Sequence, residues 1–505
     1  MTARTMTLGQ ARDLIAGARI DGDARVAFRG LSYDSRIVSA GDLFFAVLGL
    51  ERDGAAFAGE AVRRGAAAVV ARDSVDTTVP RLLVSDVRDA MGRIAARFHG
   101  DPSRELLGVG VTGTNGKTTV ASLVAGILDA TGAPAGLLGT IAYRVGRAEE
   151  RAPRTTPEAP DLHRMLRAMV DAGNRSVALE VSSHAIALGR VVGLALDAMV
   201  FTNLTRDHLD FHGTMDAYYE TKRRFFRRAD LERLAARVER AVINRDDEYG
   251  LHLAGETDLP VTTFGEASGA DVRLTVRERD LSGSVLEFET PRGPFRCRLP
   301  LPGPFHSRNA LAAVATAEAL GLPRAAIVEG IEGARAVPGR FQTVENGLGI
   351  HVIIDYAHSP DALEALLGGL RALVVRRIIT VFGCGGNRDR GKRPLMGRAV
   401  GGRSDVAVLT SDNPRREDPR AIIAEVEPGL REAGASYVAI VDRREAIARA
   451  LDEARPGDAV VIAGKGHEDY QEIGDERHPF ADVEVARSLL REREEGRRIS
   501  HAGRG

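Results

Sequence analysis

The run L-L-G-V-G-V-T-G-T-N-G-K-T-T, residues 106–119, constrains the fold more than any other segment. Its apolar part, Leu106 to Val111, predicts a buried strand that runs into a Gly-rich turn and then into an amphipathic helix. The apolar positions of that helix are Val120, Leu123, Val124, Ile127 and Leu128, and Gly132 is its expected terminator. A strand, a Gly-rich loop and a helix in this order are typical of a parallel α/β sheet.

The Gly-rich turn itself predicts phosphate binding. Successive backbone N–H groups and the helix N-terminus attract an anion, and a following lysine adds a full charge. The hydroxyl of Thr118 stands where it can ligate Mg²⁺. The full pattern G-x-x-x-x-G-K-[ST] is broken by Val111, so a Gly-rich turn that happens to hold a lysine stays open as the alternative. The expected nucleotide-binding residues are Gly113, Thr114, Asn115, Gly116, Lys117, Thr118 and Thr119.

The chain is too long for one core, and its 505 residues divide into three expected α/β domains. We place them at 1–100, 101–336 and 337–505. The first mixes short strands and helices, with a buried strand at 42–47 and a helix–strand pair at 60–72. The second carries the phosphate loop on a mostly parallel sheet. The third is a doubly wound, Rossmann-like sheet with apolar strands at 350–354, 378–382, 406–409, 437–441 and 459–463, and its charged tail from Arg491 is expected to fray.

Composition excludes several classes of protein. Lys plus Arg (69) balances Asp plus Glu (70), so the chain lacks the overall basic charge that would favour binding to nucleic acid or to an anionic membrane. The two cysteines are far apart, which argues for a reducing compartment and against a disulfide framework or a zinc site. No apolar run approaches the roughly 18 residues of a membrane span, and no signal-peptide core opens the chain. We therefore expect a cytoplasmic protein without membrane insertion and with no obligate protein partner.

Three polar groups in the central domain accompany the phosphate loop. Glu180 ends an apolar strand in A-L-E-V-S-S-H, His208 lies in T-N-L-T-R-D-H-L-D, and Lys222 follows in Y-Y-E-T-K. The carboxylate and imidazole are candidate Mg²⁺ ligands, although histidine is an unusual one. The alternatives are that Glu180 is a solvated acid, that His208 is a capping histidine and that Lys222 is a surface lysine. An N-K-x-D base reader is missing, which disfavours a guanine-nucleotide switch, but a non-catalytic nucleotide-binding protein remains open beside an ATP-driven enzyme.

These runs, taken in order, resemble the Mur ligase family, the ATP-dependent amide-forming enzymes of peptidoglycan precursor synthesis. The resemblance covers essentially the whole chain. It is carried by G-T-N-G-K-T-T, E-V-S-S-H, T-N-L-T-R-D-H-L-D, Y-Y-E-T-K, P-G-P-F-H-S-R-N-A (302–310), P-G-R-F (338–341) and D-Y-A-H-S-P (355–360). It implies a UDP-substrate-binding, a central ATPase and a C-terminal amino-acid-binding domain, and a place in cell-wall biogenesis, cell shape and division.

The resemblance also implies cofactors and residue roles. ATP and Mg²⁺ would be bound, with Lys117 on the β- and γ-phosphates and Thr118, Glu180 and His208 around the metal. Lys222 would be carbamylated by CO₂ and serve a second Mg²⁺. Lys117, Glu180, His208 and Lys222 would form the catalytic set. Asn309 would meet the adenine, Arg340 the phosphates and Asp355 the ribose.

Four polar loops follow strands of the C-terminal sheet, and such loops meet at one edge of a parallel sheet. Arginine and acidic side chains together suit an amino acid, because arginine pairs with carboxylates in a bidentate manner. The segment D-N-P-R, 412–415, resembles the signature of family members that add meso-diaminopimelate, and the lysine-adding members, which typically lack its arginine, are the alternative. Residues 416–418 are expected to be solvated charges leading into a helix. The expected contacts are Arg388, Asp412, Asn413, Pro414, Arg415, Gly464 and Glu468.

The second substrate is implied by resemblance alone. Ser35, in Y-D-S-R, matches the uridine-binding segment, and Thr155, Thr156, Ser183 and Arg190 match positions that hold the sugar-peptide. A turn serine and a surface arginine are the alternatives for Ser35 and Arg190. The implied reaction joins the D-Glu γ-carboxylate of UDP-MurNAc-L-Ala-D-Glu to meso-diaminopimelate through an acyl phosphate.

Overall fold

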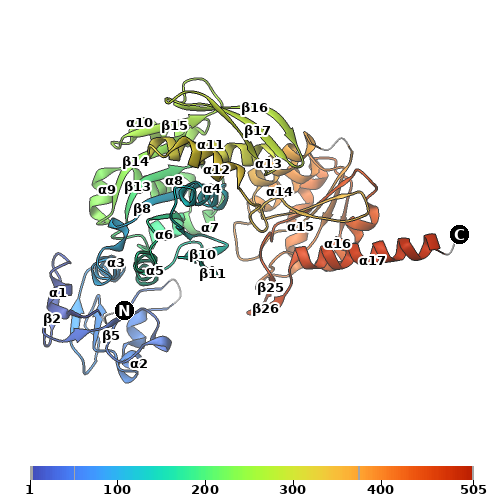
Figure 1. Cartoon of the computed structure of the whole chain (residues 1–505). Coiled ribbons are helices and arrows are strands. Elements are labelled where there is room, and N and C mark those ends of the chain that lie inside the picture. Colours follow the sequence, from blue (N-terminus) through green and yellow to red (C-terminus); the bar gives the residue numbers. More distant parts are fainter. Residues whose placement is uncertain (1–3, 50–51, 374–375, 503–505) are drawn as a thin grey trace.

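The computed structural model describes residues 4–49, 52–373 and 376–502, the last six of these by backbone alone. The described chain forms three α/β units, each with its own sheet (Figure 1). The N-terminal unit, in blue, adjoins the central unit, in cyan to yellow, and the C-terminal unit, in orange and red, lies against the other side of the central unit. No helix in the described ranges is long and apolar enough to cross a membrane.

The N-terminal unit is a small, mostly parallel sheet of order β2-β7-β6-β5-β4, in which only β2 is antiparallel to its neighbour. The strand expected at 42–47 is β5, whose four residues are all buried. The expected helix–strand pair is α2 followed by β6. The elements are β1 (Met6–Thr7), α1 (Leu8–Arg12), β2 (Arg19–Asp21), β3 (Ala27–Phe28), β4 (Gly30–Ser32), β5 (Asp42–Phe45), α2 (Ala58–Arg63), β6 (Ala68–Ala71), β7 (Arg81–Leu83) and α3 (Val87–Phe98).

The central unit has eleven strands in the order β11-β10-β9-β12-β8-β13-β14-β15-β16-β17-β18. Strands β9 to β16 in this order run parallel, and antiparallel strands extend both edges. The strands are β8 (Leu107–Thr112), β9 (Ala135–Leu138), β10 (Ala142–Val145), β11 (Ala148–Arg151), β12 (Ser176–Glu180), β13 (Ala195–Phe201), β14 (Arg237–Asn244), β15 (Val261–Gly265), β16 (Val272–Asp280), β17 (Gly283–Glu289) and β18 (Phe295–Leu299). The predicted strand before the phosphate loop is therefore confirmed as β8, at the centre of the sheet.

The helices of this unit cover the sheet and bury its apolar side chains. They are α4 (Lys117–Asp129), α5 (Ala159–Asp171), α6 (Ser183–Ala187), α7 (Leu209–His212), α8 (Met215–Arg223), α9 (Arg228–Arg233), α10 (Glu248–Glu256), α11 (Pro304–Ala319) and α12 (Arg324–Glu332). The apolar positions predicted for α4 are all at most 3% exposed and pack against the sheet, α11 and α12. Each such side chain stabilises the fold by about 1.5–3 kcal/mol, which fixes the helix behind the phosphate loop.

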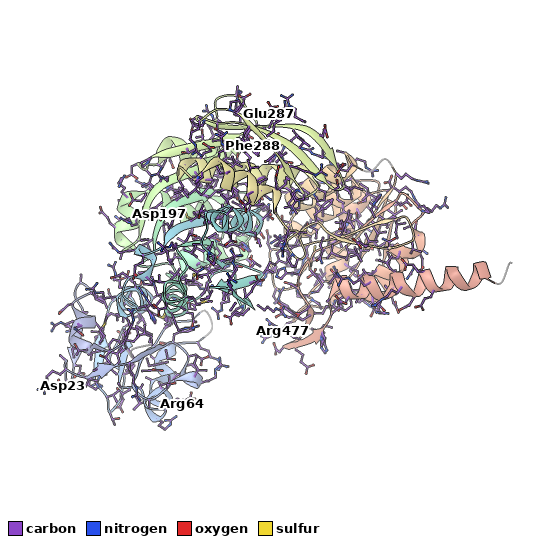
Figure 2. The ribbon with its side chains drawn as sticks, in the orientation of Figure 1. Asp23, Arg64, Asp197, Glu287, Phe288 and Arg477 are labelled. Atoms are coloured by element: carbon purple, nitrogen blue, oxygen red, sulfur yellow. The ribbon has the colours of Figure 1, made fainter. Side chains whose placement is uncertain are left out.

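Outer strands show the alternation that a half-covered sheet requires. Glu287 and Phe288 are neighbours in β17 and are both labelled in Figure 2. Phe288 is fully buried in the core, whereas Glu287 forms an ion pair with Arg277 on the other face. Successive residues of a strand point to opposite faces, so one face of β17 packs on helices and the other carries charge.

The C-terminal unit has the expected doubly wound sheet, of order β19-β20-β24-β21-β22-β23, with β19 antiparallel. All five predicted strands are present, with ends that differ by at most two residues. One core lies under α13, α14 and α15 and a second under α16 and α17. The elements are β19 (Gln342–Val344), β20 (His351–Asp355), α13 (Pro360–Arg371), β21 (Ile378–Phe382), α14 (Lys392–Gly401), β22 (Val406–Leu409), α15 (Pro419–Glu432), β23 (Tyr437–Ala439), α16 (Arg443–Glu453), β24 (Ala459–Ala463), β25 (Tyr470–Ile473), β26 (Glu476–Pro479) and α17 (Asp482–Ala502).

The expectation of a frayed tail is wrong for the described residues, because α17 continues to Ala502. Leu489 and Leu490 lie on the buried face of this helix, and Arg493 of the same helix pairs with Asp452 of α16 at 2.6 Å. Packing of one apolar face therefore holds a helix whose charged sequence suggests a free end.

Candidate active site

The phosphate loop needs both of its glycines for conformation and for space. Gly113 and Gly116 have φ values of +145° and +87°, which side-chain-bearing residues rarely adopt. A Cβ on Gly113 would lie 1.9 Å from the Thr202 hydroxyl oxygen, and one on Gly116 would lie 2.6 Å from Asn309 Oδ1. The loop thus brings the N-terminus of α4 against α11 and the end of β13.

Lys117 closes this loop over its own backbone. Its Nζ donates to the carbonyl oxygens of Gly113 at 2.9 Å and Thr114 at 2.8 Å. Burial lowers the pKa of Lys117, and the carboxylate of Glu180 nearby opposes that shift. An anion bound in the loop would supply the negative partner that this partly desolvated ammonium lacks.

Glu180 and Thr118 form the best candidate for part of a metal site. Thr118 Oγ1 donates to Glu180 Oε2 at 3.1 Å, and Thr140 donates to both carboxylate oxygens from its backbone N–H and its hydroxyl. Glu180 is 1% exposed, and no ion pair joins it in the described chain. A buried carboxylate beside a hydroxyl and without a direct ion-pair partner among the described residues has the chemistry of an Mg²⁺ ligand.

His208 stands apart from this pair, at the N-terminus of α7 with φ +55°. It is 3.6 Å from Asp207 and packs against the ring of His184, and it makes no hydrogen bond to Thr118 or Glu180. Burial lowers the pKa of His208 to about 3, so its imidazole is neutral near pH 7 and can offer a lone pair. Among the described residues there is no group of three or more His, Cys, Asp and Glu side chains that could hold a metal. Of the expected metal-binding residues, only Glu180 and His208 belong to these four residue types.

Lys222 is not a surface lysine. It is 1% exposed on α8, and its Nζ donates to Thr112 Oγ1 at 3.2 Å and to the Gly113 carbonyl at 3.0 Å. The ammonium lies 4.8 Å from the centre of the Tyr218 ring. Burial, and then the charge of Lys117, hold the pKa of Lys222 well below its usual value. The structure therefore places a readily deprotonated amine directly beneath the phosphate loop.

The C-terminal unit contributes Arg340 to the same loop. Its Nη2 donates to Thr118 Oγ1 at 3.3 Å, its guanidinium lies 4.6 Å from the centre of the Tyr356 ring, and its buried Nε has no partner in the described structure. Asp355 accepts hydrogen bonds from the backbone N–H groups of Phe341 and Ala357, both at 2.7 Å, and burial raises its pKa. Asp355 thereby fixes the turn that carries Arg340.

A charged seam joins the central and C-terminal units, and sequence reasoning missed it. Arg206 pairs with Asp389 at 3.0 Å, and Asp207 lies 3.6 Å from Lys392 and 3.5 Å from His358. Burial alone would raise the pKa of Asp207, but the hydrogen bond from His358 and the surrounding positive charges hold it well below its usual range. The adjacent charges in T-N-L-T-R-D-H were the available signal, yet their partners lie more than 150 residues away, beyond any local pattern.

The polar loops of the C-terminal unit do meet at one edge. Asn413 Nδ2 donates to Glu468 Oε2 at 2.8 Å, which joins the loop after β22 to the loop after β24. A Cβ on Gly464 would lie 2.5 Å from Asp412 Oδ2, and this buried oxygen has no partner among the described residues. An unpaired carboxylate oxygen beside a glycine has the chemistry to accept a hydrogen bond from an ammonium group.

Two arginines border the same edge. A Cβ on Gly385 would lie 3.0 Å from Arg415 Nη1 and 3.8 Å from Arg388 Cγ. Arg415 donates through Nε to Glu472 at 2.9 Å and through Nη1 to the Gly386 carbonyl at 2.8 Å, which leaves Nη2 available. Arg388 is half exposed and 4.0 Å from Asp210. Lys465 and Glu472 were missed by sequence reasoning, although Lys465 lies directly after Gly464 and three residues before Glu468, both of which were predicted.

Residues 416–418 are more than solvated charges. Glu417 accepts two hydrogen bonds, each 2.9 Å, from the fully buried Arg393, and Asp418 caps α15 by accepting from the Arg420 N–H. The expectation is wrong for Glu417, because Arg393 on α14 needs a carboxylate partner inside the unit. Pro414 lies between Asn413 and Arg415, and the Arg415 backbone takes φ +52° directly after it.

Of the five residues expected to bind the UDP-sugar-peptide, the four assigned to the sugar-peptide lie around the end of β12. Thr156 donates to the Glu180 carbonyl at 2.8 Å, Thr155 is 3.1 Å from the Thr140 hydroxyl, and Ser183 is 2.9 Å from His212. Arg190 is only 14% exposed and pairs with Glu158 at 2.9 Å, so it is not a surface arginine.

The fifth, Ser35, lies apart in the N-terminal unit, where it donates to Glu60 at 2.9 Å. That unit is tied to the central one by the Tyr33 hydroxyl, which donates to Asp161 at 2.6 Å, and by Arg88, 3.6 Å from Glu158.

Comparisons with known proteins agree with this geometry. Three family profiles match in succession: Mur ligase family, catalytic domain, over residues 27–99; Mur ligase middle domain over 111–317; and Mur ligase, glutamate ligase domain, over 339–466. The UDP-N-acetylmuramoyl-L-alanyl-D-glutamate–2,6-diaminopimelate ligase of Geobacter metallireducens is 46% identical over 510 residues, covering 96% of this chain and 99% of the relative. The enzyme of the same name from Geobacillus thermodenitrificans is 44% identical, covering 92% and 95%.

A solved structure of a UDP-N-acetylmuramoyl-L-alanyl-D-glutamate–2,6-diaminopimelate ligase superposes with a TM-score of 0.67 at 34% identity, covering 97% of this chain and 99% of that one. The similarity spans all three α/β units, and the matched ranges contain the phosphate loop 113–119, Arg206 and Asp389 of the seam, and the segment 412–415 of the polar edge. The chain belongs to the Mur ligase family.

Proposed function

We propose that this protein joins the γ-carboxylate of D-Glu in UDP-MurNAc-L-Ala-D-Glu to an amino group of meso-diaminopimelate, with ATP converted to ADP and phosphate. The Mur ligase family is ATP-dependent and acts in peptidoglycan precursor synthesis. The substrates are those named for the relatives. We assign the reaction to the cytoplasm.

One observation carries the proposal: a phosphate loop and a polar edge suited to an amino acid belong to different units that meet at one seam. Arg340, Lys392 and Asp389 of the C-terminal unit all contact the phosphate-loop side of the central unit. An enzyme that activates one substrate and condenses it with another needs this arrangement, because both reacting groups must be held together.

The reaction that fits has two steps. A carboxylate oxygen of D-Glu attacks the γ-phosphorus of ATP, and ADP leaves. The amine, after losing its proton, attacks the acyl carbon of the resulting acyl phosphate, and phosphate leaves as the amide forms. Lys117 and Arg340 would neutralise charge on the transferred phosphoryl group, and positioning supplies much of the remaining rate enhancement.

We further propose that Thr118, Glu180 and His208 hold Mg²⁺ and that carbamylated Lys222 provides a carboxylate for a second ion. Bound Mg²⁺ would neutralise phosphate charge. Support comes from the buried Glu180 without an ion pair and from the depressed pKa of Lys222. Asn309, against Gly116, is proposed for the adenine, and Asp355 for the ribose.

On the amino-acid side, Arg388 and Arg415 are proposed to hold carboxylates. Asp412 and Glu468 would hold an ammonium, with Asn413, Pro414 and Gly464 shaping the pocket. Ser35, Thr155, Thr156, Ser183 and Arg190 are proposed for the UDP-sugar-peptide. Residues 1–100, 101–336 and 337–505 would accordingly bind the UDP substrate, ATP and the amino acid.

The test is phosphate release with UDP-MurNAc-dipeptide, comparing diaminopimelate, lysine and ornithine as acceptors. Turnover is expected with diaminopimelate, and Lys117→Ala, which keeps the fold but loses its phosphate contact, is expected to be inactive. A preference for lysine would select the lysine-adding reaction instead, and near-normal turnover by Lys117→Ala would contradict the role of the loop.

A further inference from the structure

Only four of the 69 basic residues in this chain are lysines, and all four lie at the candidate active site. Lys117 and Lys222 serve the ATP side, and Lys392 reaches the seam. Lys465 is 0% exposed and has no role in the function proposed above. An ammonium is a compact point charge, whereas guanidinium is a planar fork. Lysine at these positions of an arginine-rich chain therefore marks sites where the compact charge is needed.

Lys465 connects two of the residues proposed to bind the amino acid. Its Nζ donates to Asn413 Oδ1 at 3.0 Å and to Glu468 Oε2 at 3.2 Å, and lies 5.5 Å from the centre of the Tyr470 ring. Asn413 Nδ2 donates to the same Glu468 oxygen at 2.8 Å, which closes a triangle. The backbone N–H of Glu472 also donates to Asn413 Oδ1, at 3.0 Å. These bonds fix the orientation of the Asn413 amide and occupy Oε2 of Glu468.

We propose that Lys465 is a positioning residue that makes the site select diaminopimelate over lysine. The inference rests on the proposed function. Two effects follow from the geometry. Because Oε2 of Glu468 is occupied, Oε1 is the oxygen left to accept from a substrate ammonium. Because Lys465 neutralises Glu468, the charge at the pocket is set by Arg388, Arg415 and Asp412.

Charge is what separates the two amino acids. Diaminopimelate carries one more carboxylate than lysine, on the carbon that bears the far amino group. The Glu468 side chain is 17% exposed, and without its partner cation it would be a partly desolvated, uncompensated charge. Without Lys465, Glu468 would repel the extra carboxylate of diaminopimelate and would attract the far ammonium of lysine, so the preference between the two would weaken.

The test is steady-state kinetics of Lys465→Met with each substrate varied in turn. The KM for diaminopimelate is expected to rise by about tenfold or more, equivalent to ~1.4 kcal/mol. The KM values for ATP and UDP-MurNAc-dipeptide are expected to stay within about twofold, since uniform damage to the fold would raise all three. The ratio of kcat/KM for diaminopimelate to that for lysine is expected to fall by about the same factor as the diaminopimelate KM rises.

A double variant, Lys465→Met with Glu468→Gln, shows whether Lys465 acts through Glu468. Residues that act as one unit are non-additive, so the double variant is expected to lose no more diaminopimelate kcat/KM than the worse single variant. Arg431→Met is the matched control, because it removes an exposed cation from a surface ion pair of the same unit and is expected to change neither KM nor preference.

Several outcomes would overturn the inference: an unchanged diaminopimelate KM, an equal rise in all three KM values, or fully additive losses. If Lys465→Met does not fold, the double variant decides, because it removes the Lys465 cation and the Glu468 charge together. It leaves no unpaired Glu468 carboxylate to repel diaminopimelate, so the preference for diaminopimelate is expected to be kept. A preference that weakens although Glu468 is neutral would overturn the inference. Wild-type protein inactive with diaminopimelate would instead refute the proposed function.

Discussion

Lys222 shows how the fold changes the chemistry of a single residue. A lysine on α8 is an ordinary helix residue by sequence, yet its Nζ is buried against Thr112 and Gly113. No carboxylate of the described chain pairs with it, and the depressed pKa leaves a larger neutral fraction near pH 7 than a solvated lysine has. A neutral amine is the form that reacts with CO₂, so burial prepares Lys222 for the proposed carbamate.

Activity should therefore depend on dissolved CO₂. Protein depleted of CO₂ at alkaline pH is expected to be weakly active, and added bicarbonate is expected to restore activity by about tenfold or more, as loss of one metal-ligating group would predict. Phosphate release with and without bicarbonate measures this. Lys222→Ala is the matched control, expected to be inactive under both conditions. Electron density that ends at Nζ in a crystal structure of active protein would count against the carbamate.

At the scale of elements, the loop from Ser411 to Asp418 is held in place by the β25–β26 hairpin. Its Arg415 backbone pairs with the β25–β26 hairpin, donating to the Glu472 carbonyl at 2.9 Å and accepting from Gly474 at 2.8 Å. Arg477, labelled in Figure 2 at the end of that hairpin, holds the other oxygen of Glu472 at 3.1 Å. These contacts hold the Arg415 backbone at its positive φ and place its guanidinium beside the Gly386 carbonyl.

The loop should accordingly govern amino-acid specificity. Arg415→Ala is expected to lose a charge-assisted pair worth about 1.5–3 kcal/mol, or roughly 10–100-fold in kcat/KM for diaminopimelate. Turnover of lysine, which lacks the second carboxylate, is expected to change little. The comparison control is Arg416→Ala, whose guanidinium pairs with Asp475 on the exposed surface. Equal losses with both amino acids would refute this assignment of Arg415.

Elements were predictable from sequence where local periodicity decides them. Apolar runs such as 378–382 and 459–463 become strands because they are buried on both faces. The turn before Lys117 was predictable because its glycines at 113 and 116 can adopt the positive φ that the turn requires. The β25–β26 hairpin was not predicted, since its strands carry charged and half-exposed side chains without clear alternation. The triangle around Lys465 was invisible for another reason: its members come from separate loops that only the sheet brings together.

At the scale of the whole molecule, the proposed active site lies where the central and C-terminal units meet. The phosphate loop and Glu180 belong to one unit, and Arg340 and the amino-acid edge belong to the other, beside it in Figure 1. The seam is joined by Arg206 with Asp389 and by Asp207 with Lys392 and His358. These residues flank His208 and Arg388, so the seam also sets the distance between the two proposed substrates.

Reversing one charge at the seam should slow ligation without unfolding either unit. Arg206→Glu places two carboxylates where a 3.0 Å ion pair stood. The lost pair and the new repulsion together are expected to destabilise the contact between the two units by about 1–2 kcal/mol, or roughly 5–30-fold in kcat. The thermal midpoint should move little, because Arg206 is 41% exposed and outside the cores. Arg206→Glu combined with Asp389→Arg restores an attractive pair and is expected to recover most of the rate. If the double reversal were slower than the single variant, with the same melting temperature, attraction between the two side chains would not be what supports ligation. The same outcome would mean that the two side chains act separately on their own halves of the site.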